Sequence, residues 1–299
     1  MARGGPAGPD GLAIVDKAAG WTSHDVVAKA RGLLGTRKVG HSGTLDPDAT
    51  GVLLLGVGKV TRLLRYLGLP AKTYTGVIVL GTATSTLDAS GEVTGTWAMG
   101  DTSLDEVRSA AAALTGAILQ VPPMVSAIQV GGRRLHELAR EGIEIERAAR
   151  PVTVHSFCVD PPTDAGHFPI EVSCSSGTYI RSLAADVGSA LGGGAHLRDL
   201  RRTAIGSFTV EDGVAVEALD PDHLLTPAEA LRDLVSVAVP DEVADDVAHG
   251  KVLDLDRLGV VGEGPWPVVG PSGTLLAVYE PHRAGTAKPS VVLASPAQP

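Results

Sequence analysis

The sequence has few of the residues on which disulfide, metal and membrane chemistry depend. Only two of its 299 residues are cysteines, Cys158 and Cys174, and no Cys-x-x-Cys spacing occurs. We therefore expect two buried, reduced thiols and neither a disulfide framework nor a zinc site. No apolar run approaches the roughly 18 residues that cross a bilayer, and residues 1–10 lack the apolar stretch of a signal peptide. These absences predict a cytoplasmic protein that does not bind a membrane.

Nucleotide-binding motifs are missing as well. The chain contains neither a G-x-G-x-x-G nor a G-x-x-x-x-G-K-[ST] sequence, so the common dinucleotide and P-loop phosphate sites are excluded. Aromatic residues make up only 3% of the chain, which makes a tyrosine close to a lysine, as in Lys72-Thr-Tyr74, stand out. The missing motifs agree with a function that needs no cofactor and no metal ion.

Negative charge dominates the chain, but it is unevenly distributed. The formal net charge is −9, yet residues 203–299 hold 5 Lys/Arg against 15 Asp/Glu, and residues 1–202 hold 20 against 19. The first two thirds can therefore carry a basic face that binds the phosphates of a nucleic acid. Four clusters are candidates for this face: Arg37-Lys38; Lys59, Arg62 and Arg65; Arg133-Arg134; and Arg198, Arg201 and Arg202.

The apolar pattern predicts an α+β fold. We expect strands near residues 11–15, 51–57, 73–80 and 168–174, and helices near residues 23–34, 60–67, 103–114, 178–191 and 226–234. Because these elements do not alternate as regular βαβ units, a mixed or antiparallel sheet is expected and a doubly wound fold is not. A boundary is expected near residue 235, followed by a small, acidic, β-rich module.

Residues 40–53, Gly-His-Ser-Gly-Thr-Leu-Asp-Pro-Asp-Ala-Thr-Gly-Val-Leu, constrain function more tightly than any other stretch. Pro47 pushes Asp46 out of the helical region, and the nearby glycines permit tight chain reversals around it. A lone Asp-Pro pair is ordinarily a turn. Here His41 and two hydroxyl residues lie within a few positions of the carboxylate. We therefore expect Asp46 to be presented at the floor of a pocket.

Three separated motifs then carry a resemblance. Residues 40–53 resemble the catalytic motif of the bacterial TruB-type tRNA pseudouridine synthases, in which the Asp of G-x-L-D-P-x-A-T-G is catalytic. Gln120-Val-Pro-Pro-Met-Val-Ser-Ala127, continuing to Arg150-Pro-Val-Thr153, is similar to the central segment of that family. Cys174-Ser-Ser-Gly-Thr-Tyr-Ile-Arg181, followed by Gly194-Ala-His-Leu-Arg-Asp-Leu-Arg-Arg202, resembles its third motif. Order and spacing match over roughly residues 10–210.

The resemblance implies roles for individual residues. Asp46 would be the nucleophile, Arg181 the arginine that pairs with it, and Tyr74 the tyrosine that stacks on the target uracil. The further substrate-binding residues would be Lys72, Tyr179, Leu200 and, beside the flipped nucleotide, His41. Without the resemblance, Arg181 reads as a surface arginine and the tyrosines as packing residues. In a closed pocket, burial would raise the pKa of Asp46 and the guanidinium would lower it.

The resemblance also implies a substrate and a domain plan. The substrate would be the uridine at position 55 in the TΨC stem-loop of tRNA, modified by a monomer that needs no protein partner. Residues 1–235 would form the catalytic domain, with an RNA-clasping insertion at about 122–150. Residues 236–299 fall where many relatives carry a PUA domain, although their acidity does not suit RNA binding. Attack at ribose C1′, attack at uracil C6 and removal of a ribose proton all stay open.

Two other functions fit parts of the sequence. Asp46-Pro-Asp-Ala-Thr50 matches the D-x-D-x-[TV] pattern of HAD-type, Mg²⁺-dependent phosphohydrolases. In those enzymes the motif ends a continuous apolar strand, which residues 40–45 cannot form. A non-catalytic RNA-binding or tRNA-chaperone protein would use the basic clusters and leave Asp46 incidental. The combination of Asp46, Arg181 and Tyr74 argues against that alternative as the whole function.

Overall fold

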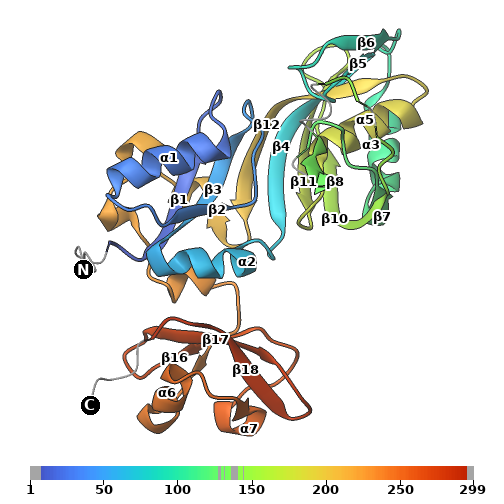
Figure 1. Cartoon of the computed structure of the whole chain (residues 1–299). Helices are drawn as coiled ribbons and strands as arrows, with labels where there is room; N and C mark the ends of the chain where they lie inside the picture. Colours follow the sequence, from blue (N-terminus) through green and yellow to red (C-terminus); the bar gives the residue numbers. More distant parts are fainter. Residues whose placement is uncertain (1–7, 127–128, 131, 136–140, 144, 295–299) are drawn as a thin grey trace.

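A nine-stranded mixed sheet forms the body of the protein (Figure 1). The computed structural model describes residues 8–126, 129–130, 132–135, 141–143 and 145–294. The strand order is β1-β3-β12-β4-β11-β10-β7, with β2 paired to β3 and β13 paired to β12. The strands are β1 Gly11–Lys17, β2 Val39–Ser42, β3 Thr50–Val57, β4 Lys72–Leu80, β7 Gly116–Gln120, β10 Arg150–Val159, β11 His167–Cys174, β12 Ala195–Ile205 and β13 Phe208–Thr209. Within this sheet β12 and β3 are parallel and the other pairs are antiparallel, which confirms the expected α+β fold with a mixed sheet.

Three helices pack on this sheet through small apolar faces: α1 Ser23–Leu33, α3 Leu104–Ala113 and α5 Ile180–Ala190. The sequence Ser103-Leu-Asp-Glu106 predicts a capping box at the start of α3. The box is present, because Ser103 accepts from Glu106 N and Glu106 in turn accepts from Ser103 N. Helix α5 buries Leu183, Ala184 and Val187 against the sheet. These helices lie close to the predicted segments because caps and apolar periodicity are local signals.

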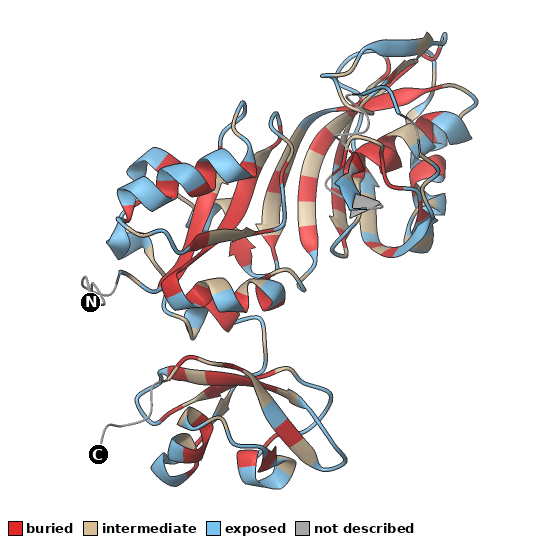
Figure 2. Cartoon of the chain, viewed as in Figure 1, coloured by how far each residue is buried: buried red, intermediate tan, exposed pale blue. Residues whose placement is uncertain are grey.

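The central strands β4 and β12 lie between two separately packed halves (Figure 1). One half holds α1 with β1, β2 and β3, and the other holds α3 and α5 with β7, β10 and β11. Each half has its own buried apolar cluster, and buried positions alternate along β4 (Figure 2). A site over β4 and β12 can therefore receive side chains from both halves.

Smaller elements complete the body. The two short hairpins are β5 Thr82–Thr84 with β6 Val93–Thr96, and β8 Gln129–Val130 with β9 Arg133–Arg134. The helix expected near residues 60–67 is a 3-10 turn, η1 Gly58–Leu63, followed by a single α-helical turn, α2 Leu64–Leu67. The helix expected near residues 226–234 is only a 3-10 turn, η5 Glu229–Leu231. Other 3-10 turns are η2 Val210–Asp212, η3 Val216–Ala218 and η4 Pro221–His223. Apolar periodicity identified these segments as helical but did not distinguish short turns from helices.

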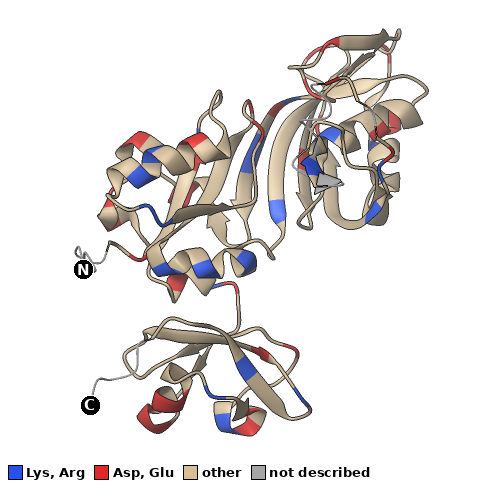
Figure 3. Cartoon of the chain, in the orientation of Figure 1, with Lys and Arg blue, Asp and Glu red and all other residues tan. Residues whose placement is uncertain are grey.

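A second sheet is formed by residues 237–292. Its order is β14-β16-β17-β18-β15, with bounds β14 Val237–Ala238, β15 Leu253–Asp254, β16 Trp266–Val269, β17 Leu275–Pro281 and β18 Thr286–Val292. Helices α6 Asp241–Ala248 and α7 Leu255–Leu258 pack beside it, and acidic residues gather on α6 (Figure 3). We refer to residues 236–299 as the C-terminal module. The proposed division at residue 235 stays a prediction about independent folding.

The C-terminal module binds the body through η1 and α2. Arg62 Nη1 donates to the carbonyl of Val292 at 2.6 Å, and Arg65 Nη2 pairs with Glu280 Oε1 at 2.5 Å. Lys59 Nζ also reaches the module, where it donates to a main-chain carbonyl at 3.3 Å. These three basic residues were expected on an RNA-binding face. In the structure they contact the acidic module, and a basic face formed by the other clusters stays a prediction.

One of the two cysteines departs from the expectation. Cys174 on β11 is buried as predicted, but Cys158 on β10 is exposed. A β-bulge between Val154 and Ser156 shifts the pairing of β10 with β11 by one residue. Such a shift reverses which residues face the core, so Cys158 faces solvent. Among the described helices, none is long and apolar enough to span a bilayer.

Candidate active site

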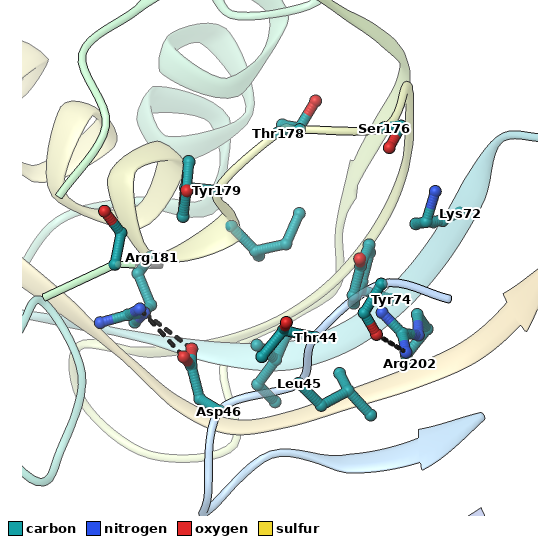
Figure 4. Close-up of a pocket in the computed structure, with 15 residues that line it drawn as sticks. Thr44, Leu45, Asp46, Lys72, Tyr74, Ser176, Thr178, Tyr179, Arg181 and Arg202 are labelled. Carbon is teal, nitrogen blue, oxygen red and sulfur yellow. Dashed lines mark hydrogen bonds and ion pairs between the residues drawn. The ribbon is translucent and has the colours of Figure 1, made fainter. Parts of the chain in front are cut away.

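Asp46 lies in the turn that joins β2 to β3, and neighbouring elements hold this turn in place. At the start of α1, Ser23 Oγ accepts a hydrogen bond from Leu45 N at 2.9 Å and donates one to Leu45 O at 3.3 Å. The buried ammonium of Lys17 donates to the carbonyl of Pro47 at 2.9 Å. The residues on both sides of Asp46 are thus fixed. Its carboxylate points toward α5 at the edge of a cavity (Figure 4).

The Asp46 carboxylate and the Arg181 guanidinium form a two-point ion pair. Arg181 Nε lies 3.0 Å from Asp46 Oδ2, and Arg181 Nη2 donates to Asp46 Oδ1 at 3.1 Å. The Arg181 side chain is 4% exposed, whereas that of Asp46 is 39% exposed. A paired fork of this kind fixes the direction of the carboxylate as well as attracting it. A substrate can therefore approach an aspartate that is already oriented.

The remaining donors of Arg181 are also used. Its Nη1 donates to the carbonyl of Thr86 at 2.8 Å and lies 3.3 Å from Asp88 Oδ2. Its Nη2 donates to the carbonyl of Val125 at 2.9 Å. One buried positive charge is thus shared by two carboxylates, with two carbonyls completing its hydrogen bonds. This arrangement leaves Arg181 little freedom to turn away from Asp46.

The surroundings raise the pKa of Asp46 above its ordinary value, with burial as the main cause. Arg181 opposes this rise, while the neighbouring carboxylates Asp88 and Asp48 add to it. The sequence predicted that burial would raise the pKa of Asp46 and that the guanidinium would lower it, and burial has the larger effect. A carboxylate with a raised pKa binds a proton more readily than a free aspartate, as is common for groups at functional sites.

A cavity of about 270 Å³ opens beside this ion pair. Its lining comes from both halves of the sheet and from the centre, and comprises Gly43, Thr44, Leu45, Asp46, Lys72, Tyr74, Ser126, Ser176, Gly177, Thr178, Tyr179, Ile180, Arg181, Leu200 and Arg202 (Figure 4). Its volume is at the small end of the range for ligand pockets, which suits a single base. A second cavity of about 380 Å³ shares Asp46, Arg181 and Leu200 with the first and extends past Asp88.

Tyr74 reaches the cavity from the central strand β4 and is only 8% exposed. Its hydroxyl is hydrogen-bonded to the Arg202 side chain (Figure 4). Arg202 is 1% exposed and also donates to the carbonyls of Val52 at 2.7 Å and Gly43 at 3.1 Å. It therefore links the tyrosine to the turn that carries Asp46. Burial, with a further contribution from Arg202, lowers the pKa of the neighbouring Lys72 to about 8.

Comparison with known protein families agrees with this geometry. Residues 31–180 match the N-terminal domain of the TruB family pseudouridylate synthases, and residues 181–238 match the tRNA pseudouridylate synthase B C-terminal domain. The tRNA pseudouridine synthase B of Thermobifida fusca is 46% identical over 294 residues, covering 95% of this chain and 99% of its own. The chain belongs to the TruB family. The corresponding protein of Nocardia farcinica is 47% identical over 278 residues, covering 90% and 89% of the two chains.

Solved structures support the same fold for this TruB-family protein. A chain in the crystal structure of a Cbf5–Nop10–Gar1 complex superposes with a TM-score of 0.72 at 26% identity, covering 91% of this chain and 78% of the other. A chain in an archaeal box H/ACA sRNP Nop10–Cbf5 complex also gives 0.72, at 23% identity, over 97% and 88% of the two chains. The family match gives no support to a phosphohydrolase or to a purely RNA-binding protein.

The structure brings six of the seven predicted site residues to one cavity. Asp46, Lys72, Tyr74, Tyr179, Leu200 and Arg181 all line it. His41 is not among the described residues of the lining, and its ring instead meets that of His24 edge-on at 5.3 Å. The insertion predicted at 122–150 falls partly outside the described residues. Its described start lies at the site, where the carbonyl of Val125 accepts from Arg181.

Sequence reasoning missed two side chains of this site. Arg202 was assigned to a basic surface cluster, because a sequence cannot show that a guanidinium is buried. No role was predicted for Asp88, and its carboxylate shares Arg181 with that of Asp46. The presence of Arg202 in the third motif was the one available signal for it. No signal in the sequence distinguished Asp88 from an ordinary turn residue.

Proposed function

We propose that this TruB-family protein converts a uridine of tRNA into pseudouridine at position 55 of the TΨC loop, with Asp46 as the reacting group. The observation that carries the proposal is the two-point pairing of Asp46 with the buried Arg181 at the edge of a one-base cavity. Tyr74 contributes a wall of that cavity. The family membership supports the reaction class, and the names of the relatives support tRNA as the substrate.

The reaction needs a carboxylate and a shaped cavity. The N1–C1′ bond of uridine breaks, the uracil turns, and a C5–C1′ bond forms, while the proton on C5 leaves and N1 gains one. Asp46 serves as nucleophile at C1′ or C6, or removes a ribose proton. Arg181 holds the carboxylate in its direction of attack. The base must leave its stack to reach the cavity, and the ring of Tyr74 offers a face against which it can stack.

Closure of the cavity by RNA would change the pKa of Asp46. A bound base excludes water from the exposed side of Asp46, which raises its pKa further. Arg181 is already buried and already paired, so it needs no rearrangement to oppose this rise. Arg181 therefore limits the rise in the pKa of Asp46 that burial causes, and it keeps the carboxylate oriented while water is excluded.

The oligomeric state, the cellular location and the role of His41 are also part of the proposal. We propose that the enzyme acts as a monomer and needs no protein partner. We place the enzyme in the cytoplasm, where its tRNA substrate is made. His41 is proposed as a contact for a nucleotide next to the target, from its position on β2 before the catalytic turn.

Release of tritium from C5-labelled uridine in a tRNA transcript tests the function directly. The wild type should release tritium with and without a chelator. Asp46→Asn keeps the shape but removes the reacting carboxylate, so release should stop while tRNA binding is retained. Asp48→Asn is the matched control, because Asp48 is exposed two residues further along the same turn, and it should lose little. Near-normal release by Asp46→Asn would overturn the mechanism, and inactivity of Asp48→Asn alone would reassign the carboxylate.

A further inference from the structure

A buried glutamine joins the edge of the sheet to the helix that carries Arg181. Gln120 is the last residue of β7 and is 3% exposed. Its side-chain amide forms two hydrogen bonds with the main chain of Tyr179, the residue just before α5. Gln120 Oε1 accepts from Tyr179 N at 2.8 Å, and Gln120 Nε2 donates to Tyr179 O at 3.1 Å. A primary amide thus completes a two-point pairing of the kind found between strands.

This pairing fixes the main chain at the start of α5. Tyr179 is the N-cap residue of α5, and its own side chain makes no capping hydrogen bond. The Tyr179 carbonyl already accepts the first hydrogen bond of the helix, from Leu183 N at 3.2 Å. The main-chain N–H of a capping residue lies outside the helix and needs another partner. Gln120 supplies it, so the position of the helix start is set by a strand 59 residues earlier in the chain.

The residues held in this way belong to the cavity. Tyr179 lines it, and Arg181, two residues further on, carries the fork that pairs with Asp46. A shift of the first turn of α5 would move both relative to the carboxylate. Contacts further along the same segment, such as Ser182 Oγ to the carbonyl of Val121 at 3.3 Å, do not fix the main chain at Tyr179. Gln120 lines a third cavity that shares Ser176, Gly177 and Tyr179 with the catalytic one, and it is not among the described residues that line the catalytic cavity.

We propose that Gln120 is a positioning residue for pseudouridine formation, which acts by holding the main chain of Tyr179 and through it the Arg181–Asp46 pair. The inference rests on the proposed function. A displacement of about 1 Å at a reacting pair lowers the rate strongly, whereas binding of a large RNA is spread over many contacts. Loss of Gln120 should therefore reduce the chemical step and leave the affinity for tRNA nearly unchanged.

The test compares Gln120→Met, Gln120→Glu and Ser182→Ala with the wild type in single-turnover pseudouridine formation, tRNA binding and thermal unfolding. Met keeps the size of the side chain without either hydrogen bond, and its rate should fall at least about tenfold with affinity within about twofold. Ser182→Ala removes a hydrogen bond of the same junction without touching Tyr179, so its rate should stay near that of the wild type. A Gln120→Met rate within about twofold of the wild type would overturn the proposal.

The pH dependence of the Gln120→Glu rate distinguishes a positioning role from a general loss of stability. The ionised carboxylate of this variant keeps the acceptor for Tyr179 N but turns a second oxygen toward Tyr179 O, and the protonated form restores a donor there. Its rate relative to the wild type at the same pH should therefore rise as the pH is lowered from 8 to 6. A ratio that is flat or falls would contradict the positioning role. A wild type that forms no pseudouridine at all would instead refute the proposed function, which separates the two failures.

Discussion

Deletion of the C-terminal module should destabilise the catalytic body, even though all three family motifs end before residue 203. The reason is a shared apolar core. Residues of the module lie in the same buried cluster as residues of η1 and α2: Leu275, Val278, Val291 and Leu293 on one side, and Val60, Leu63, Tyr66 and Leu67 on the other. Removal of residues 236–299 would expose the second group to water.

The size of the effect follows from the burial of these four side chains. Full burial of one apolar side chain contributes about 1.5–3 kcal/mol, so half-exposure of four would cost about 3–6 kcal/mol. The whole free energy of unfolding of a domain is only about 5–15 kcal/mol. For a domain of this size, each kcal/mol lowers Tm by about 2–4 °C, which gives a fall of about 6–24 °C. The loss of hydrogen bonds from Tyr66 Oη to Glu280 and Ser290 adds to this fall.

Thermal unfolding and pseudouridine formation on an isolated TΨC stem-loop measure the two consequences separately. The truncated protein should unfold at the lower temperature and yet modify the stem-loop well below that temperature, because every residue assigned to the cavity lies in the body. Val291→Ser, a buried position of the interface, should reproduce part of the loss, and Val261→Ser, 88% exposed in the same module, should not. An unchanged Tm after truncation would refute the shared-core argument. A truncated protein that folds but is inactive would refute the predicted domain division.

Four further predictions concern the site and its charges. Arg181→Lys keeps the charge but loses the fork, so the single-turnover rate should fall about 10²-fold with tRNA affinity retained. Since the pKa of Lys72 is about 8, tRNA affinity should weaken as the pH rises through 8, and Lys72→Arg should abolish that weakening. Asp46→Asn should have a Tm equal to or above that of the wild type at pH 7. The pKa of Asp46 is raised in the folded state, so the ionised carboxylate lowers the free energy of unfolding at this pH. The difference in Tm should vanish below the ordinary pKa of aspartate, where the carboxylate is protonated in both states. Affinity for tRNA should fall steeply with salt despite the acidic chain, and a flat dependence would contradict a basic binding face.

The parts of the fold that could be predicted from the sequence are those with local causes. The capping box at Ser103 and the alternating strand 168–174 are specified by neighbouring residues, and both occur where expected. The long strand β12 was not predicted, because it contains three arginines and an aspartate and has little apolar alternation. It is held by pairing with β4 on one side and β3 on the other, and such pairing is a tertiary effect.

The same distinction holds for the site. Asp46 and Arg181 were predictable as a pair because motifs place them, although 135 residues separate them. The sharing of Arg181 with Asp88, and the burial of Arg202 between Tyr74 and the catalytic turn, depend on packing that no motif records. The positions of charged residues in the sequence predicted their roles least well. A basic cluster on the sequence can equally bind RNA, hold another module or support a tyrosine.

The arrangement of the site explains why its partners come from distant segments. Asp46 lies in the turn between β2 and β3, two strands that pack with α1, whereas Leu45 and Ala49 of the same turn pack in the buried cluster of α5, the helix that carries Arg181. Tyr74 and Arg202 lie on the central strands between them. A carboxylate with a raised pKa and a buried guanidinium each oppose folding unless both halves hold them together. The catalytic geometry is therefore a property of the assembled sheet, and substitutions that loosen either half should slow the chemical step before they unfold the protein.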